Sequence, residues 1–258
     1  MKLDLLWWAG WALCAALIAL PLMAIPLIGP VAGFAAWAVL APWTALIGLA
    51  AVHRVLPRSD PGTFRLSGDA GSLRWALKGW APSVYLTLFQ PVFFASPGFQ
   101  RLVLRSFGAH LGDGAWLTSR TVIREPHHLS VGARSLIGEY AHLACSFQPR
   151  PGMLVVAPIV IGEDTLVSAH CHIGPGASVG ARCVLEHAVV VGPAVVIGDD
   201  ARIGAGTAIY RSARIGRGAR IGKHCVIPSG CRIADGQRIP DGTTLAASER
   251  SRKVEVLS

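Results

Sequence analysis

The 258-residue chain is apolar and basic: hydrophobic residues make up 52% of it, charged residues only 15%, and its formal net charge is +9. Such an apolar composition is typical of a membrane protein. Nucleic acid is a poor partner, because sixteen Lys and Arg face twelve Asp and Glu after residue 110 and no recognition motif accompanies them.

The first predicted element is an apolar stretch from Leu5 to Val52 that contains no charged residue. Each half has about twenty residues, which is what a helix needs to cross the hydrocarbon core of a bilayer. Pro26, Gly29 and Pro30 interrupt the stretch near its middle. We therefore expect a transmembrane helical hairpin over residues 1–56.

Cations flank this hairpin, with Lys2 before it and Arg54 and Arg58 after it, whereas the connecting loop has none. The positive-inside rule then places both ends in the cytoplasm. A cleaved signal peptide is the competing interpretation, but the apolar stretch is too long for one. We expect a multi-pass protein in the lipid of the cytoplasmic (inner) membrane, with the rest of the chain facing the cytoplasm.

Residues 57–107 mix Trp and Tyr with Arg and Lys, a combination suited to the headgroup layer. Up to His110 the chain carries eight Lys and Arg against three Asp. This predicts an interfacial, amphipathic helical segment. The alternative is a helical subdomain packed on the C-terminal part of the chain.

A six-residue repeat begins after this segment. Every sixth residue from Ile161 to Leu245 is aliphatic, and a small or slender side chain comes four residues after almost every one of them. The same register extends backward through Val155, Leu143, Ile137 and Val131. A period of six does not suit a helix, but it suits short parallel strands joined at tight corners. We expect a β domain over 108–247 and a C-terminal tail over 248–258.

With this repeat, the sequence from about Gly108 to Leu245 resembles the hexapeptide-repeat acyltransferase superfamily. The resemblance implies a mainly β fold, a left-handed parallel β-helix with three hexads per triangular coil. It also implies a homotrimer whose acyl-donor groove lies between subunits. The superfamily holds sugar, serine and lipid acyltransferases, gamma-type carbonic anhydrases and nucleotidyltransferase tails.

The function that this resemblance implies is acyl-CoA-dependent O- or N-acetyl(acyl) transfer to a membrane-linked or surface-destined acceptor. The donor would be acetyl-CoA or another acyl-CoA. No metal is expected, because the three zinc-binding histidines of the carbonic anhydrases are not found at the family spacing.

The cysteines of the repeat are expected to be buried free thiols. They occupy its inward small position, at Cys171, Cys183, Cys225 and Cys231. A zinc site in the "HCH" of residues 170–172 is disfavoured, because the cysteine points inward while the two histidines point outward.

The outward histidines are candidates for chemistry. His170 and His172 lie on the hexad that starts at Val167, and His187 lies on the next coil. Neighbouring coils are about 4.8 Å apart, so we expect the three rings to be neighbours. Such a group can hold a general base near neutral pH. Solvated surface histidines are the alternative.

Two stretches, "IGEYAHLACSFQPR" and "APIVIGEDTLVSAHCHIGPGASVG", resemble the flanks of the active-site loop in galactoside and maltose acetyltransferases. Those enzymes keep a catalytic histidine before a proline, where this chain has Gln148 before Pro149. Glutamine cannot act as a general base. His142 is therefore the first candidate for the base and His170 the second, while His127 and His128 rank lower because the register slips there.

The acceptor site would be formed by His172, His187 and Gln148, with the loop from Phe147 to Gly152 covering the acceptor.

Arg202, Arg220 and Arg238 recur at eighteen-residue spacing, and we expect them to share one corner of three successive coils. Stacked like charges repel, so an anion against the ladder would explain it. In the family, later coils meet the phosphates of coenzyme A, which predicts that this ladder binds the donor. Anionic lipid headgroups and plain solvation are the alternatives.

The overall layout also resembles membrane-associated acyltransferases of surface-polysaccharide pathways and the membrane-linked C-terminal region of poly-amino-acid and related peptide synthetases. The second resemblance allows another function, a non-catalytic assembly or docking module of a membrane biosynthetic complex. Gln148 favours this alternative.

Overall fold

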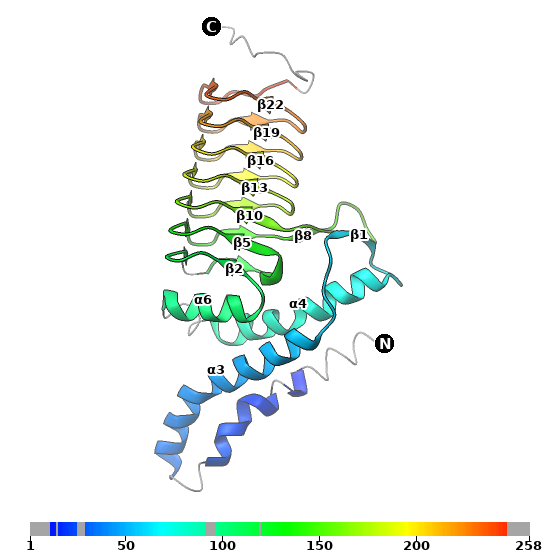
Figure 1. The fold of residues 1–258 in the computed structure, drawn as a ribbon, viewed down its shortest axis with the longest axis vertical. Helices are drawn as coiled ribbons and strands as arrows, with labels where there is room; N and C mark the ends of the chain where they lie inside the picture. The colour runs from blue at the N-terminus through cyan, green and yellow to red at the C-terminus, as the bar shows by residue number, and fades with distance from the viewer. Residues whose placement is uncertain (1–10, 14, 25–28, 91–95, 119, 247–258) are drawn as a thin grey trace.

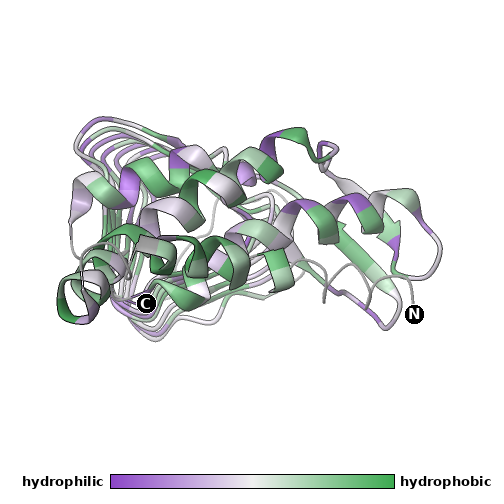
Figure 2. Cartoon of the chain, turned by 90° about the horizontal axis from the view of Figure 1, so that it is seen from below, coloured by the Kyte–Doolittle hydropathy of each residue, from purple (hydrophilic) through white to green (hydrophobic). Residues whose placement is uncertain are grey.

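A computed structural model describes residues 11–13, 15–24, 29–90, 96–118 and 120–246. A tall solenoid of short strands stands on a layer of helices, and the helices come first in the chain (Figure 1). The view from below shows these helices running across the base of the solenoid (Figure 2).

The N-terminal helices form an antiparallel pair. Residues 11–13 and 15–19 are α-helical, the 3-10 helix η1 (Leu20–Ala24) follows, and then comes α3 (Pro30–Val55). The Trp37 indole donates to the carbonyl of Ile18 at 2.8 Å, and the Thr44 hydroxyl donates to the carbonyl of Leu17 at 2.9 Å. The predicted interruption lies where α3 begins, with Gly29 at φ +83° and Pro30 in the first turn.

Within the described residues, α3 is the one helix that is long and apolar enough to cross a membrane. The predicted hairpin of two transmembrane helices is therefore not shown. The helical segment before α3 changes to a 3-10 turn at Leu20, and Pro21, which lacks an N–H, cannot continue an α-helical hydrogen-bond ladder. Residues 1–10 and 25–28, where the rest of that prediction falls, lie outside the described residues.

The helix α4 (Ala70–Leu88) packs against α3, and α6 (Pro97–Ser106) packs against the first coil of the solenoid. Asp69 begins α4 by accepting a hydrogen bond from the N–H of Gly71 at 2.8 Å. Tyr85, Leu104 and Phe107 are fully buried in a core that continues into the solenoid. The helical subdomain packed on the repeat is thus present, and a position of this segment on the membrane stays a prediction.

The solenoid has about seven coils and three flat parallel sheets. Face I consists of β2 (His110–Leu111), β5 (Leu129–Val131), β10 (Ile159–Ile161), β13 (Ser178–Val179), β16 (Val196–Ile197), β19 (Arg214–Ile215) and β22 (Arg232–Ile233). Face II consists of β3 (Trp116–Leu117), β6 (Leu136–Ile137), β11 (Leu166–Val167), β14 (Val184–Leu185), β17 (Arg202–Ile203), β20 (Arg220–Ile221) and β23 (Arg238–Ile239). Face III consists of β4 (Val122–Ile123), β7 (His142–Leu143), β12 (His172–Ile173), β15 (Val190–Val191), β18 (Ala208–Ile209) and β21 (Val226–Ile227).

This architecture confirms the predicted parallel β-helix. The last residue of each solenoid strand points inward and is buried, as Ile197 and Ile203 show, and the small positions such as Ala201 and Thr207 are buried as well. At several corners, close stacking of the coils requires glycine after the aliphatic residue. A Cβ on Gly198 would lie 2.7 Å from the backbone nitrogen of Arg217 in the next coil.

One segment leaves the solenoid between faces III and I. A hairpin of β8 (Ser146–Phe147) and β9 (Met153–Val156) projects sideways and pairs with β1 (Gly62–Arg65), which precedes α4 (Figure 1). The prediction that Val155 belongs to the solenoid wall is therefore wrong, because it opposes Thr63 in this small sheet. The hairpin adds twelve residues to one coil, two whole hexads, so the sequence register continues across it unchanged.

We expect the inward wall to dominate stability. Replacing Ile197, which is 2% exposed, by Ala should lower the free energy of unfolding by about 2–5 kcal/mol, since it opens a cavity between two coils. The matched change of its neighbour Val196, which is 41% exposed, should cost no more than about 0.5 kcal/mol. Chemical unfolding followed by circular dichroism checks both, and equal effects would contradict the inward register.

Candidate functional site

A pair of histidines lies on face III, on neighbouring coils. His142 and His172 are partners in the register of β7 and β12, and the inward side chains beside them are Leu143 and Ile173. Their Nδ1 atoms are 3.1 Å apart and their ring centroids 4.7 Å apart. One ring must therefore donate its Nδ1 proton to the other, which requires at least one neutral imidazole.

The surroundings of both rings favour the neutral imidazole over the imidazolium. Partial burial, then the charges of His172 and Arg124, lower the pKa of His142 below the ordinary value of 6.5. Burial also lowers the pKa of His172. When His142 donates from Nδ1 to His172, its Nε2 lone pair is free to accept a proton. This is the arrangement of a general base oriented by a second group.

His170 belongs to a different cluster, at the corner between faces II and III. Its ring stacks on Tyr140 with centroids 5.0 Å apart and planes 6° apart, and the ring of His187 lies 5.0 Å away. Arg120 lies over the Tyr140 ring and donates to its hydroxyl. The rings of His170 and His187 are thus neighbours as expected.

The expected grouping of three histidines is wrong in one respect. His172 is paired with His142, because it sits on a strand while His170 sits at the preceding corner with φ +58°. His187 is also not directly above His170, since the residue eighteen positions later is Ala188. The two rings reach each other diagonally.

The hairpin does not bring Gln148 to either histidine cluster. A cavity of about 370 Å³ lies between the hairpin and the corner from face III to face I, and Phe147, Arg150 and Arg211 are among its lining residues. Gln148 is exposed in the turn and does not line this cavity. The cavity is also not lined by His142 or His172.

Glu125 is a buried carboxylate that the sequence pattern does not predict. Glu125 is 2% exposed, and its Oε1 accepts hydrogen bonds from the Ser146 hydroxyl at 2.6 Å and the Trp75 indole at 3.1 Å. It therefore joins the base of the hairpin to α4. Glu125 lies where the hexad register slips, in the segment before β5, so the repeat gives no signal for it.

The arginine ladder lies on a flat face. Arg202, Arg220 and Arg238 are register partners in β17, β20 and β23 on face II, so their expected position at a corner is wrong. The residue before each inward aliphatic is on the strand, where alternation turns its side chain outward. All three are exposed, and within the described part of the chain no hydrogen bond or ion pair joins them to a carboxylate.

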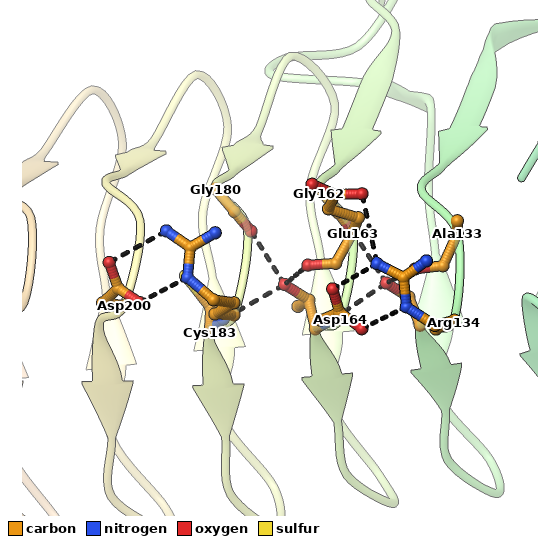
Figure 3. Close-up of polar contacts among 11 residues, drawn as sticks. Ala133, Arg134, Gly162, Glu163, Asp164, Gly180, Cys183 and Asp200 are labelled. Atoms are coloured by element: carbon orange, nitrogen blue, oxygen red, sulfur yellow. Dashed lines mark hydrogen bonds and ion pairs between the residues drawn. The ribbon is translucent and has the colours of Figure 1, made fainter.

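Other charges stack with alternating sign. At the corner between faces I and II, Arg134 pairs with Asp164 on the next coil at 2.6 Å (Figure 3). At the same corner, Arg182 pairs with Asp200 at 2.7 Å. Each guanidinium contacts both oxygens of its carboxylate. This corner neutralises its own charges, whereas the face II ladder does not.

The thiols and carboxylates offer little to a metal. Among the described residues there is no cluster of three or more His, Cys, Asp or Glu that could hold a metal ion. Cys171, Cys183, Cys225 and Cys231 are buried, as the repeat predicts. Burial raises the pKa of Cys171 to about 11, so this thiol stays protonated at neutral pH.

Comparison with known proteins agrees with this geometry. The family described as "Hexapeptide repeat of succinyl-transferase" matches residues 158–193, 188–211 and 194–233. This part of the solenoid therefore consists of hexapeptide repeats, which confirms the resemblance seen in the sequence. No curated protein sequence matches the chain.

Solved structures of similar fold include LpxA from Acinetobacter baumannii, which is 17% identical with a TM-score of 0.47 over 53% of this chain and 56% of that one. AntD, an N-acyltransferase from Bacillus cereus, is 15% identical with a TM-score of 0.42 over 52% and 80% of the two chains. PerB from Caulobacter crescentus is 19% identical with a TM-score of 0.37 over 61% and 71%. The chain thus spans little more than half the length of LpxA, and these similarities concern the fold alone.

Glu125 should be a structural anchor. Replacing it by Ala leaves the partly buried hydroxyl of Ser146 and the indole of Trp75 without their acceptor, which should lower the free energy of unfolding by about 1–3 kcal/mol. The matched change of Glu163, which is exposed and 3.4 Å from Arg134, should cost less than about 1 kcal/mol. Thermal unfolding of both variants checks this, and equal losses would show that Glu125 does not anchor the hairpin.

Proposed function

We propose that this chain is a membrane-anchored, acyl-CoA-dependent O- or N-acetyl(acyl)transferase acting on a membrane-linked or surface-destined acceptor. The observation that supports the proposal most is the His142–His172 pair, a base held in one orientation on the outer face of a hexapeptide-repeat solenoid. His142 is the proposed base, and His170 is the second candidate.

In the proposed reaction, Nε2 of His142 takes the proton from the acceptor hydroxyl or amine as that atom attacks the thioester carbonyl of the donor. His172 holds the ring by accepting a hydrogen bond from its Nδ1–H, and it stabilises the imidazolium that forms. The C–S bond then breaks, and the proton passes from His142 to the departing thiolate. Acceptor and donor exchange one acyl group and one proton, so no further reactant is required.

The proposed donor site is the ladder of Arg202, Arg220 and Arg238. Three uncompensated guanidinium groups in register are suited to the phosphates of coenzyme A. The ladder projects from face II and the histidine pair from face III, so one chain does not bring them to the same surface. A trimer, in which a face of one subunit meets another face of its neighbour, would supply both to one groove.

Membrane anchoring is supported by α3. Its first half exposes large apolar side chains, at Val31, Phe34, Val39 and Leu40. One side of its second half is buried against the other helices, which connects the proposed anchor to the solenoid. We propose that the solenoid faces the cytoplasm, where acyl-CoA is available.

Replacing His142 by Ala should reduce transfer of the acetyl group about a hundredfold or more, because the general base is lost. The matched control is His224→Ala, an exposed histidine outside both clusters, which should keep its activity. Transfer to a hydroxyl or amine acceptor measures both. A loss in His170→Ala with full activity in His142→Ala would move the base to His170.

The same base predicts a pH profile. Because the pKa of His142 is lowered, the imidazole stays neutral down to below pH 6.5, and kcat/KM should fall only beneath that value. Initial rates between pH 5 and 8 check this. An acid limb above pH 6.5 would contradict His142 as the base.

The donor site is tested by calorimetric titration of the detergent-purified full chain with acetyl-CoA and with free coenzyme A. Arg220→Gln should weaken saturable binding about tenfold or more, since charge-assisted hydrogen bonds are lost. Arg232→Gln, an outward arginine on face I, is the matched control and should bind normally.

A docking module is the second candidate function, favoured by the exposed Gln148 in the hairpin turn. Absence of coenzyme A binding, together with unchanged cellular function in variants lacking His142 and His170, would support it over the enzyme.

A further inference from the structure

A second, strongly cationic pocket lies at the base of the solenoid, away from the histidine pair. It has a volume of about 450 Å³ and lies between the end of α3, α4 and the first coil. Its cationic or titratable lining side chains are His53, Arg54, Arg58, Lys78, Arg105, His110 and His127. Asp60 is the one carboxylate among its described lining residues.

Among the described residues, most cations of this pocket have no neighbouring carboxylate; Arg105 is the exception, with Asp113 at 3.5 Å. Within the described residues, Arg54 and Arg58 have no carboxylate partner. The carboxylate of Asp60 lies 3.9 Å from Arg74, a residue that does not line the pocket. Burial and the charge of Arg58 lower the pKa of Lys78. The pocket therefore holds like charges close together, and an anion would relieve their repulsion.

Its deepest cation is fixed in place. Lys78 is 8% exposed, and its ammonium donates to the carbonyls of His53 and Leu56 at the end of α3. An ammonium has three protons, so one remains for a ligand. Next to it, both ring nitrogens of His127 are buried without a partner in the described residues. A neutral His127 ring has one N–H, so an unpaired donor lies beside the remaining proton of Lys78.

The position of the pocket identifies the class of ligand. It opens where α3 ends, and α3 is the helix long and apolar enough to cross a membrane. In a bilayer, the end of such a helix lies at the level of the lipid headgroups. The anion present at that level is the phosphate of a lipid.

We propose that this pocket binds the phosphate group of an anionic membrane lipid, with Arg54, Arg58 and Lys78 as its main ligands. The inference rests on membrane anchoring, one part of the proposed function, and is independent of acyl transfer. Bound lipid would fix the end of α3 against the first coil and so set the height of the solenoid above the membrane.

The test is calorimetric titration of the detergent-purified full chain at 150 mM salt, where weak surface attraction is screened. The probes are dioctanoyl phosphatidic acid, dioctanoylglycerol without the phosphate, and inorganic phosphate. The double variant R54Q/R58Q is compared with R65Q/R101Q, which removes one arginine of β1 and one of α6 that do not line the pocket.

We expect saturable binding of phosphatidic acid, weakened about tenfold or more in R54Q/R58Q and changed less than about twofold in R65Q/R101Q. Dioctanoylglycerol should not bind. Equal weakening in both double variants, or no binding by the unaltered chain, would overturn the proposal. Inorganic phosphate binding as tightly as the lipid would instead assign the pocket to a soluble phosphate.

The unfolding temperature of each variant without lipid is the control for folding. Arg54 and Arg58 are exposed, so we expect it to stay unchanged. Should the double variant be unstable, the single variant R58Q provides the same comparison against R65Q.

Discussion

Hydrogen bonds between the backbones of successive coils fix every outward side chain above its counterpart one coil below. The Gly192 N–H donates to the carbonyl of Ile209 at 2.7 Å, and equivalent bonds recur throughout the solenoid. This ladder leaves no freedom of register, because a slip of one residue would turn the inward aliphatic side chains outward. The outward positions therefore form a regular lattice, and the residue types at these positions determine which side chains stack on one another from coil to coil. The histidine pair and the arginine ladder are both consequences of it.

The lattice explains why two stacks of charge behave differently. At the corner between faces I and II the sign alternates from coil to coil, so Arg134 and Arg182 find carboxylates in place and need no ligand. On face II the same spacing puts Arg220 between Arg202 and Arg238. Such a row is tolerated in water, where exposed charges interact weakly, and it becomes favourable when an anion bridges the coils. A repeat can thus acquire a binding surface by changing one outward position in successive coils.

The repeat made most of the solenoid predictable from sequence, because a strict period of six specifies the inward face directly. It could not reveal the β8–β9 hairpin, since an insertion of two hexads leaves the period intact and the aliphatic Val155 keeps its place in it. The pairing of His142 with His172 was likewise hidden, because the two are thirty residues apart and eighteen was the expected spacing. Glu125 had no periodic signal, and its role depends on Trp75 and Ser146, which only the tertiary structure brings to it.

The helical base and the solenoid share one hydrophobic core, which runs without a break from Ala45 in α3 to Leu245 in the last coil. A shared core fixes the position of the helices relative to the coils, because close-packed side chains cannot slide past one another without a large cost in free energy. The end of α3, the cationic pocket and the first coil therefore keep a fixed relation to the histidine pair on the second and third coils. If α3 lies in the membrane, a phosphate bound near Arg58 would hold face III at a constant height above the headgroups. An acceptor that is itself linked to the membrane could then reach His142 by diffusing in two dimensions only, which is the physical advantage of anchoring such a solenoid to a bilayer.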